Sequence, residues 1–181
     1  MSKKYLLGVD GGTEGLRAGV FDVFGTSLAF ASTSYPTQFP APSWAEQDPN
    51  DWWDALGKSV RKAISDSGIS VDQIAAMAVD TTCCSVVPLD DSGNPVRPAL
   101  IWMDVRSAEQ AEQMVATEDD ALLINSNGSG PVSAEWMIPK ALWIKQNEPE
   151  NFDRAVTICE YQDYINLHLT GRLGASINNV S

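Results

Sequence analysis

Residues 5–22 read YLLGVDGGTEGLRAGVFD, and this stretch decides the fold. A short apolar run ends at Asp10, a glycine turn that contains Thr13 follows, and a second apolar strand leads out of the turn. Gly11 and Gly12 have no Cβ, so the backbone can turn tightly and bring N–H groups against an anion. Thr13 adds a hydroxyl donor, and Asp10 at the strand end is placed to hold Mg²⁺, directly or through water. The stretch predicts a phosphate-binding β-hairpin, and an ordinary hairpin with a glycine turn is the alternative reading.

Two common nucleotide-binding motifs are absent from the sequence. Neither G-x-x-x-x-G-K-[ST] nor G-x-G-x-x-G occurs, and the glycine turn leads into a second strand rather than a helix. P-loop and Rossmann folds are therefore excluded. A strand, a phosphate turn and a strand at the start of a chain resemble the actin, Hsp70 and sugar-kinase superfamily, whose ribonuclease-H-like domains use D-x-G-T for phosphate and metal. The predicted fold class is α/β, with a mixed sheet flanked by helices.

Composition limits the classes of partner. The chain has 181 residues, 44% of them hydrophobic, and its 24 acidic against 12 basic residues give a net charge of −12. An acidic balance of this size argues against nucleic acid or an anionic membrane as a partner. The first apolar run is too short for a signal peptide, and no run approaches the length of a membrane span, so a cytoplasmic location is predicted. Three cysteines, two of them adjacent, and a single histidine provide no zinc-binding spacing.

Hydrophobic periodicity and turn residues predict the remaining elements. A third strand over 25–35 is followed by a helix from Asp48-Pro49 to a stop at Gly68. The continuous apolar run 74–79 predicts a buried central strand whose polar carboxyl end faces a site. Further strands are predicted over 85–89 and 99–102, joined by the turn at 90–95, and helices over 107–115, 118–125, 135–146 and 161–169, the last capped by Gly171.

Several separated segments resemble one family in order and spacing. They are GVDGGTEGLRAGVFD, SWAEQDPNDWWDAL, IAAMAVDTTCCSVVPLDDSGNPVRPALIWMDVR, SAEWMIPKALW and a late LTG. Together they are similar to the N-terminal domain of the FGGY carbohydrate kinases, the group that contains glycerol kinase, xylulokinase and ribulokinase. The resemblance covers essentially residues 1–181. It implies transfer of the γ-phosphoryl group of MgATP to a sugar or polyol, with ATP and Mg²⁺ as cofactors, and it leaves open a homodimer of the full-length protein.

The resemblance also implies roles for individual residues. It implies that one segment binds the metal and the phosphate groups of the nucleotide, with Asp10 as the metal ligand. The other residues of this segment are Gly11, Gly12, Thr13 and Arg17. The residues implied on the sugar side are Thr82, Cys83, Asp104, Arg106 and Glu135. Four of these residues also have a structural reading: Asp104 and Glu135 as acids near helix starts, Arg106 as a partner of Asp104, and Cys83, together with Cys84, as small buried packing.

Departures from the family pattern bear on the substrate. Cys83 and Cys84 stand where glycerol kinase has an Arg-Glu pair that binds glycerol hydroxyls, which disfavours glycerol kinase. The Met-His-Gly segment of xylulokinases has no counterpart here, since the single histidine is His168. The segment at 133–136, SAEW, and the Cys84-Ser85 step resemble ribulokinases. A ketopentose such as ribulose is the predicted substrate, with xylulose, a pentitol or another polyol as alternatives.

The catalytic base of the family, an Asp in a G-x-x-D-type segment, is not found after Gly171. The resemblance therefore predicts an N-terminal sugar-binding domain that is incomplete at its C-terminus, without the C-terminal ATP-binding domain or any catalytic residue of its own, and inactive alone. A non-catalytic sugar-binding or interaction module derived from a kinase is a second hypothesis. An ATPase scaffold of the actin and Hsp70 kind is a third, against which the segments between Trp44 and Trp143 argue.

Overall fold

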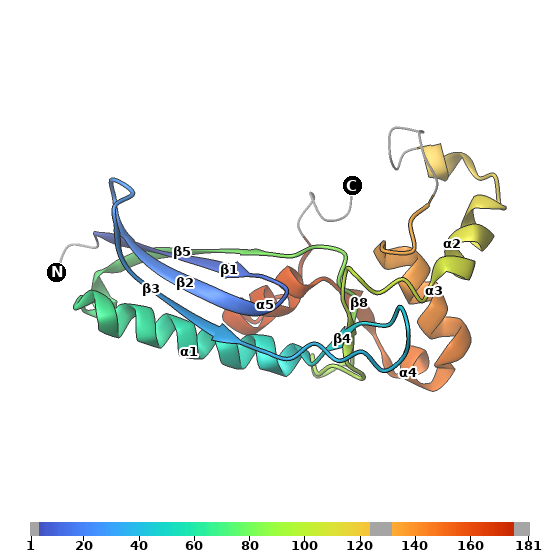
Figure 1. Ribbon diagram of the computed structural model, residues 1–181, viewed down its shortest axis with the longest axis horizontal. Helices are drawn as coiled ribbons and strands as arrows, with labels where there is room; N and C mark the ends of the chain where they lie inside the picture. Colours follow the sequence, from blue (N-terminus) through green and yellow to red (C-terminus); the bar gives the residue numbers. More distant parts are fainter. Residues whose placement is uncertain (1–3, 124–131, 176–181) are drawn as a thin grey trace. The chain divides into compact units, whose positions relative to one another are not determined.

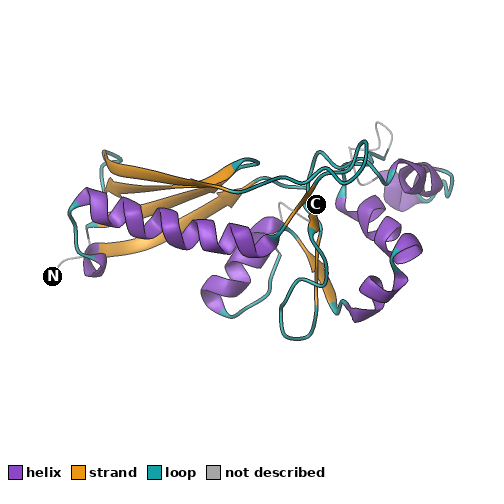
Figure 2. Ribbon diagram, turned by 60° about the horizontal axis from the view of Figure 1, so that its bottom comes forward, coloured by secondary structure: helices purple, strands orange, loops and turns teal. Residues whose placement is uncertain are grey.

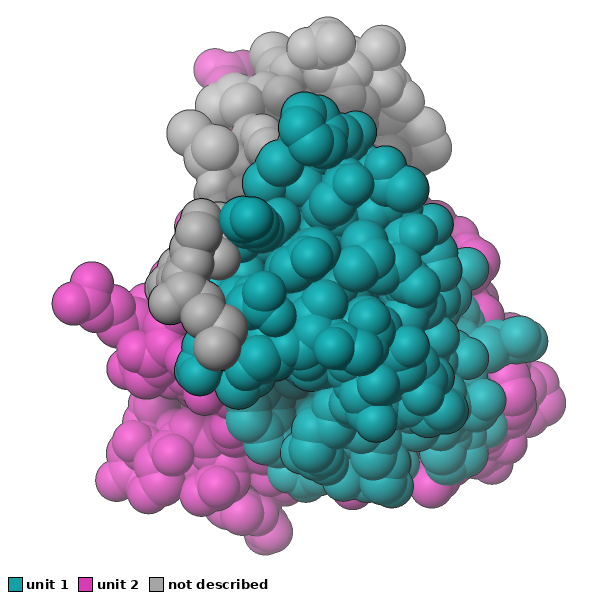
Figure 3. All heavy atoms as spheres, turned by 90° about the vertical axis from the view of Figure 1, so that its left-hand side faces the viewer, with its two compact units in different colours: residues 1–37, 50–82 teal, residues 38–49, 83–181 magenta. Residues whose placement is uncertain are grey.

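The computed structural model describes residues 4–123 and 132–175. The chain forms two compact units (Figure 3). The first comprises residues 1–37 and 50–82, and the second comprises residues 38–49 and 83–181. The predicted phosphate segment belongs to the first unit, and most of the predicted sugar-side residues belong to the second.

A four-stranded mixed sheet is the main feature of the first unit (Figure 1). β1 (Tyr5–Gly11), β2 (Gly15–Asp22) and β3 (Ser27–Ser34) follow one another as antiparallel neighbours. β5 (Ile74–Thr81) then pairs with β1 in parallel, so that the strand order is β3-β2-β1-β5. The predicted hairpin, the third strand and the mixed sheet are confirmed.

The long helix α1 (Pro49–Ser67) runs along one face of this sheet (Figure 2). Its Ser59 hydroxyl donates to the carbonyl oxygen of Leu16 at 3.1 Å, which ties the helix to β2. The helix ends at Gly68, whose φ of 70° is a left-handed conformation that glycine adopts without steric cost. The side chains buried in this unit include Leu7, Val9, Leu16, Ala18, Val20, Trp52 and Leu56.

The prediction that the run 74–79 is a buried central strand is half wrong. The run does form β5, but β5 lies at the edge of the described sheet, and Met77 is 36% exposed. A strand is buried on both faces only when layers cover both faces, and it is central only when strands flank it on both sides. Within the described residues, β5 is paired with β1 alone.

The second unit is built from short strands and helices. β4 (Glu46–Gln47) pairs with β7 (Ala99–Leu100), and β6 (Val87–Leu89) pairs with β8 (Thr157–Cys159). The helices are α2 (Ala108–Val115), α3 (Met137–Asn147), α4 (Pro149–Arg154) and α5 (Tyr161–Thr170). Two 3₁₀ turns, Val71–Gln73 in the first unit and Asp120–Leu123 in the second, complete the described elements.

Val86, Leu100 and Ile144 form a fully buried cluster in the second unit, against which Met137, Trp143, Phe152 and Ile158 pack.

Several predicted boundaries of the second unit differ from the structure. The strands expected over 85–89 and 99–102 are shorter, and each takes a distant partner, although Val86 and Leu100 still exchange backbone hydrogen bonds of 2.8 and 3.1 Å. The helix expected over 118–125 is a 3₁₀ turn over its described part, and residues 124 and 125 lie outside the described residues. The short elements α4, β4 and β8 were not predicted, because segments of two to six residues carry little periodicity.

Candidate functional site

The turn between β1 and β2 is held by its own backbone. The Gly12 N–H donates to the carbonyl oxygen of Gly15 at 3.0 Å, and the Tyr35 hydroxyl donates to the carbonyl oxygen of Gly12. A Cβ at Gly15 would lie 2.8 Å from the carbonyl oxygen of Thr33, so β3 approaches too closely for any side chain there. The Gly12 N–H is used within the turn, and this glycine therefore contributes the shape of the turn rather than a donor for an anion.

Asp10 and Arg17 face each other across β1 and β2. They are cross-strand partners in the register, and the Arg17 Nη2 lies 2.5 Å from the Asp10 Oδ2. Both side chains are at least half exposed, at 51% for Asp10 and 66% for Arg17. The structure thus presents one anionic and one cationic group beside the glycine turn, and both can reach a ligand from solvent.

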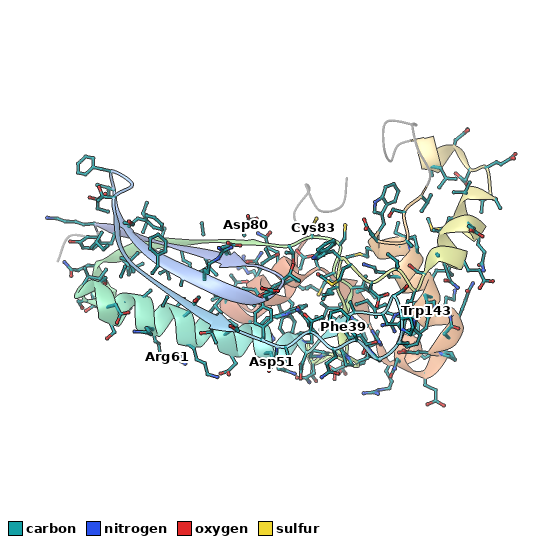
Figure 4. The ribbon with its side chains drawn as sticks, in the orientation of Figure 1. Phe39, Asp51, Arg61, Asp80, Cys83 and Trp143 are labelled. Atoms are coloured by element: carbon teal, nitrogen blue, oxygen red, sulfur yellow. The ribbon has the colours of Figure 1, made fainter. Side chains whose placement is uncertain are left out.

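Asp80 is a further acidic residue on this sheet that was not among the predicted site residues. It is the partner of Asp10 in the parallel register of β1 and β5, so the two carboxylates leave the same face of the sheet at adjacent strands. Figure 4 labels Asp80 on β5. The signal was present in the sequence, since Asp80 ends the apolar run, but the register that pairs it with Asp10 was not.

These carboxylates suit a hydrated divalent cation. Mg²⁺ is usually held by one or two carboxylates together with water and substrate phosphate oxygens, and Asp10 with its register neighbour Asp80 provides that donor set. Among residues 4–123 and 132–175, no group of three or more His, Cys, Asp or Glu side chains is arranged around a common metal position. The residues fit a metal shared with phosphate better than a protein-only metal cage.

A hollow of about 330 Å³ lies along the same part of the sheet. Its lining includes both Asp10 and Arg17, together with Gly8, Gly19, Phe21 and Phe30. The two glycines leave room there, since a Cβ at Gly19 would come within 2.5 Å of the Phe30 ring. The charged pair therefore stands at the side of an open concavity rather than on a flat surface.

In the second unit, the turn at Cys83 and Cys84 directly follows Thr82. Cys83 is exposed (Figure 4), and Cys84 is half-buried with φ at 61°, a left-handed conformation that is uncommon for a residue with a Cβ. Burial and the neighbouring Cys83 raise the pKa of the Cys84 thiol to about 11. The structural reading of Cys83 as buried packing is wrong, because its side chain is exposed to solvent.

Two buried charged residues bind this turn. The carboxylate of Glu160 accepts the N–H of Cys84 at 3.1 Å and the N–H of Ser85 at 2.8 Å. The ammonium of Lys140 donates to the carbonyl oxygen of Cys84 at 2.9 Å and to that of Ile101 at 2.8 Å. Burial lowers the pKa of Lys140 to about 8 and raises the pKa of Glu160 to about 7. Neither residue was among the predicted site residues, because long-range contacts bring them to the turn.

Asp104 and Arg106 are close together, as their spacing suggested. Asp104 is fully buried, and its Oδ2 accepts the Ala45 N–H at 2.6 Å and the Arg106 Nη2 at 2.7 Å. The Arg106 guanidinium is also fully buried, and it reaches Glu46 at 2.8 Å. Both side chains are engaged with protein groups, and contact of either with a sugar stays a prediction.

Two tryptophans complete the surroundings of Arg106. The guanidinium lies over the Trp44 ring at 3.7 Å and near the Trp143 ring at 4.9 Å, and the two rings meet edge to face at 5.3 Å. Figure 4 labels Trp143, which lies on α3. Trp143 is thus a packing residue, and it also packs against the buried cluster of Val86, Leu100 and Ile144.

The remaining sugar-side residues are Thr82 and Glu135. Thr82 is half-buried directly after β5, and its N–H donates to the carbonyl oxygen of Gly11 at 2.9 Å. Glu135 is exposed and lies just before α3 rather than in its first turn. Its negative charge acts on Lys140, for which it is one of the groups that raise the pKa. In the first unit the structure gathers the predicted phosphate residues in one hairpin, and in the second it brings Asp104 and Arg106 together.

Comparison with known proteins agrees with this geometry. Residues 5–181 match the N-terminal domain of the FGGY family of carbohydrate kinases. The chain belongs to this family. It is 35% identical to a xylulose kinase of Lactococcus lactis over 176 residues, an alignment that covers 93% of the chain. It is 29% identical to a ribulokinase of Anoxybacillus flavithermus over 198 residues, an alignment that covers 96% of the chain. The crystal structure of xylulose kinase from Rhodospirillum rubrum superposes with a TM-score of 0.91 at 29% identity over 98% of the chain.

The FGGY assignment from sequence is therefore confirmed, as is the sugar-kinase fold. The chain spans about a third of each relative, namely 33% of the Lactococcus protein, 35% of the Anoxybacillus protein and 36% of the Rhodospirillum chain. Relatives named xylulose kinase and ribulokinase both occur, so the preference for ribulose inferred from the pocket residues stays a prediction. In the described residues, no helix is both long and apolar enough to cross a membrane.

Proposed function

We propose that the protein carrying this FGGY domain transfers the γ-phosphoryl group of MgATP to a hydroxyl group of a ketopentose, and that the domain supplies the sugar-binding part. The observation that carries the proposal is the family match over residues 5–181. The names of the relatives support a ketopentose, because xylulose and ribulose are both five-carbon ketoses.

The two units contribute different groups to this reaction. In the first, Asp10 with its neighbour Asp80 would hold Mg²⁺, and Arg17 would offset phosphate charge beside the glycine turn. Bound there, the ion would neutralise charge that develops on the transferred phosphoryl group. In the second, the exposed Cys83 and Glu135 are accessible to a sugar, whereas the buried Asp104 is bound by Ala45 and Arg106.

Cys83 and Cys84 favour a ketopentose over glycerol. A site that binds glycerol through an Arg-Glu pair provides charge-assisted hydrogen bonds to a small triol, and neither residue of such a pair stands at positions 83 and 84. Glu135 can accept hydrogen bonds from two hydroxyls of a longer substrate. A short ligand that leaves such groups unpaired loses a few kcal/mol of binding, which is about 10²-fold in kcat/KM.

A substrate panel on the full-length protein tests the proposal. ADP release is measured with D-ribulose, L-ribulose, D-xylulose, ribitol and glycerol, each against a reaction without sugar. We expect one ketopentose to exceed glycerol by at least about 10²-fold in kcat/KM. Binding of a ketopentose without ADP release would instead support the non-catalytic module, and glycerol as the best substrate would overturn the pocket assignment. Because these 181 residues span about a third of each relative and phosphoryl transfer needs the metal, the base and both sides of the phosphate clamp together, we expect them alone to show no sugar-dependent ADP release.

A further inference from the structure

Cys84 stands in a backbone conformation that its side chain disfavours. Its φ of 61° lies in the left-handed region, where a Cβ approaches the following carbonyl oxygen and where glycine is the usual occupant. Such a conformation persists only when the surrounding structure enforces it, and it is commonly found at functional sites. The residues that enforce it at Cys84 can be identified from its hydrogen bonds.

Both ends of Cys84 are bound by buried charges of opposite sign. Its N–H donates to the Glu160 carboxylate at 3.1 Å, and its carbonyl oxygen accepts from the Lys140 ammonium at 2.9 Å. The second Glu160 oxygen accepts the next N–H of the chain, that of Ser85, at 2.8 Å. Lys140 is fully buried and Glu160 is 4% exposed, so neither interaction is screened by solvent. The two peptide groups that flank Cys84 are therefore held in place by ionic hydrogen bonds.

Lys140 links this turn to a second segment. An ammonium group has three donors, and here the acceptors are the carbonyl oxygens of Cys84 at 2.9 Å, Ile101 at 2.8 Å and, more weakly, Trp102 at 3.4 Å. Ile101 and Trp102 directly precede the segment that contains Asp104. One buried cation thus fixes the Cys83–Cys84 turn relative to the segment that carries Asp104 and Arg106.

Two buried charges are a costly way to stabilise a fold. Removing two charges from water is unfavourable, and apolar side chains of similar volume frequently stabilise a protein as well or better. The cost is visible in the pKa values. Burial lowers the pKa of Lys140 and raises the pKa of Glu160, and both shifts disfavour the charged form of the residue. What the charges supply and apolar residues do not is directional hydrogen bonding to the backbone of one turn.

We propose that Lys140 and Glu160 are positioning residues that hold Cys84 in its left-handed conformation and thereby fix the exposed Cys83 for sugar binding. Neither residue is required to touch the sugar, since both act through the turn. The inference rests on the proposed function only for its kinetic consequence, because the effect of the two residues on the turn is independent of any activity.

The first test measures the turn directly. In the full-length protein, alkylation by N-ethylmaleimide is followed by mass spectrometry of the peptide that carries Cys83 and Cys84. The exposed Cys83 should react quickly and the half-buried Cys84 slowly. Glu160→Gln and Lys140→Met should accelerate the second alkylation at least about tenfold, since a loosened turn exposes Cys84. The controls are Glu150→Gln and Lys145→Met, which make the same changes at exposed positions, the latter on the same helix as Lys140.

The second test is rescue. Glu160→Gln should raise KM for the ketopentose at least about tenfold while KM for ATP stays within about twofold, because only the sugar-side turn is disturbed. Adding Cys84→Gly should recover most of that loss, since glycine adopts a φ of 61° without help, whereas Cys84→Ala removes the same thiol but keeps the Cβ and should not. A merely structural role for Glu160 predicts no difference between the two double variants.

The outcomes separate the two proposals. Absence of sugar-dependent turnover in the wild type overturns the proposed function and leaves the alkylation test valid. Unchanged alkylation in both single variants overturns the positioning role, as does equal behaviour of the Gly and Ala double variants in an active enzyme. If Lys140→Met does not fold, Glu160→Gln carries the test, because glutamine keeps the shape of the side chain and one acceptor oxygen.

Discussion

The guanidinium of Arg106 lies 3.7 Å from the centroid of the Trp44 ring while its Nη2 donates to Asp104 at 2.7 Å. One planar group therefore stacks on an aromatic ring and forms an ionic hydrogen bond in its own plane, which lysine cannot do. The Arg106 and Asp104 side chains are both fully buried, and Arg106 also reaches Glu46 at 2.8 Å, so one guanidinium balances two carboxylates.

Arg106→Met should destabilise the protein strongly. Asp104 would keep the N–H donors of Ala45 and of residue 106 but lose the guanidinium, and leaving a buried charge without its partner costs about 3–5 kcal/mol. Lys58→Met, which removes one side of the exposed pair with Asp54, should cost less than about 1 kcal/mol. Urea unfolding followed by tryptophan fluorescence measures both, and equal losses in the two variants would contradict the buried-pair interpretation.

Glu160 should make stability depend on pH in the acidic range. Its pKa is raised to about 7 in the folded protein from 4.5, mainly by burial, so between these values the folded state holds a proton that the unfolded state has released. Through Glu160 alone, stability should therefore fall by at most about 3 kcal/mol as pH rises from about 4.5 to 7.

Comparison of unfolding free energies at pH 5 and 7 tests this dependence. Glu160→Gln should flatten the difference, and Glu150→Gln, at an exposed position, should retain it. A slope that persists in Glu160→Gln would assign the titration to another group.

How far the sequence predicts this structure depends on the range of the interactions involved. The hairpin around Asp10 and the helix ending at Gly68 were predicted because their signals are local: glycine at a turn, Pro at a helix start, apolar residues at a fixed period. The exposure of β5 was not predicted, because an apolar run has the same appearance in the sequence whether its strand lies at the edge or at the centre of a sheet. Its surroundings depend on which other segments pair with it.

In the candidate site, too, the residues linked by local contacts were predicted and those linked by long-range contacts were not. Asp10, Arg17 and the glycine turn form one local unit, and their proximity follows from the hairpin register. Glu160 lies 75 residues from Ser85 in sequence, and Lys140 lies 56 from Cys84, so no local pattern connects them to the turn that they hold. Family resemblance draws attention to residues with recurrent side chains, whereas these two act on backbone groups, which every residue type has.

Glu135→Gln should weaken binding of the sugar without affecting the nucleotide. Glutamine keeps the length of the side chain but replaces one acceptor oxygen with a donor, so a hydroxyl pair bound by both oxygens loses one hydrogen bond. We expect KM for the ketopentose to rise about 3–10-fold, with KM for ATP and the kinetics of glycerol unchanged. The control is Glu109→Gln on α2, also exposed. Unaltered ketopentose kinetics would remove Glu135 from the sugar site.

Asp10→Asn should lower kcat far more than affinity for the sugar. The carboxylate is the group proposed to hold Mg²⁺, and stabilisation of charge by the metal is needed mainly in the transition state. We expect kcat to fall at least about 10²-fold, with the dissociation constant of the ketopentose, measured without nucleotide, changed less than about threefold.

Loss of folding does not account for such a result. The ion pair of Asp10 with Arg17 is at least half exposed on both sides, and pairs of this kind contribute about 1 kcal/mol or less to stability. Asp72→Asn, at an exposed position of the same unit, serves as the control and should leave kcat unchanged. Because a threefold change in kcat corresponds to less than about 1 kcal/mol of barrier, an Asp10→Asn enzyme that retains kcat within that range would show that the metal is held elsewhere.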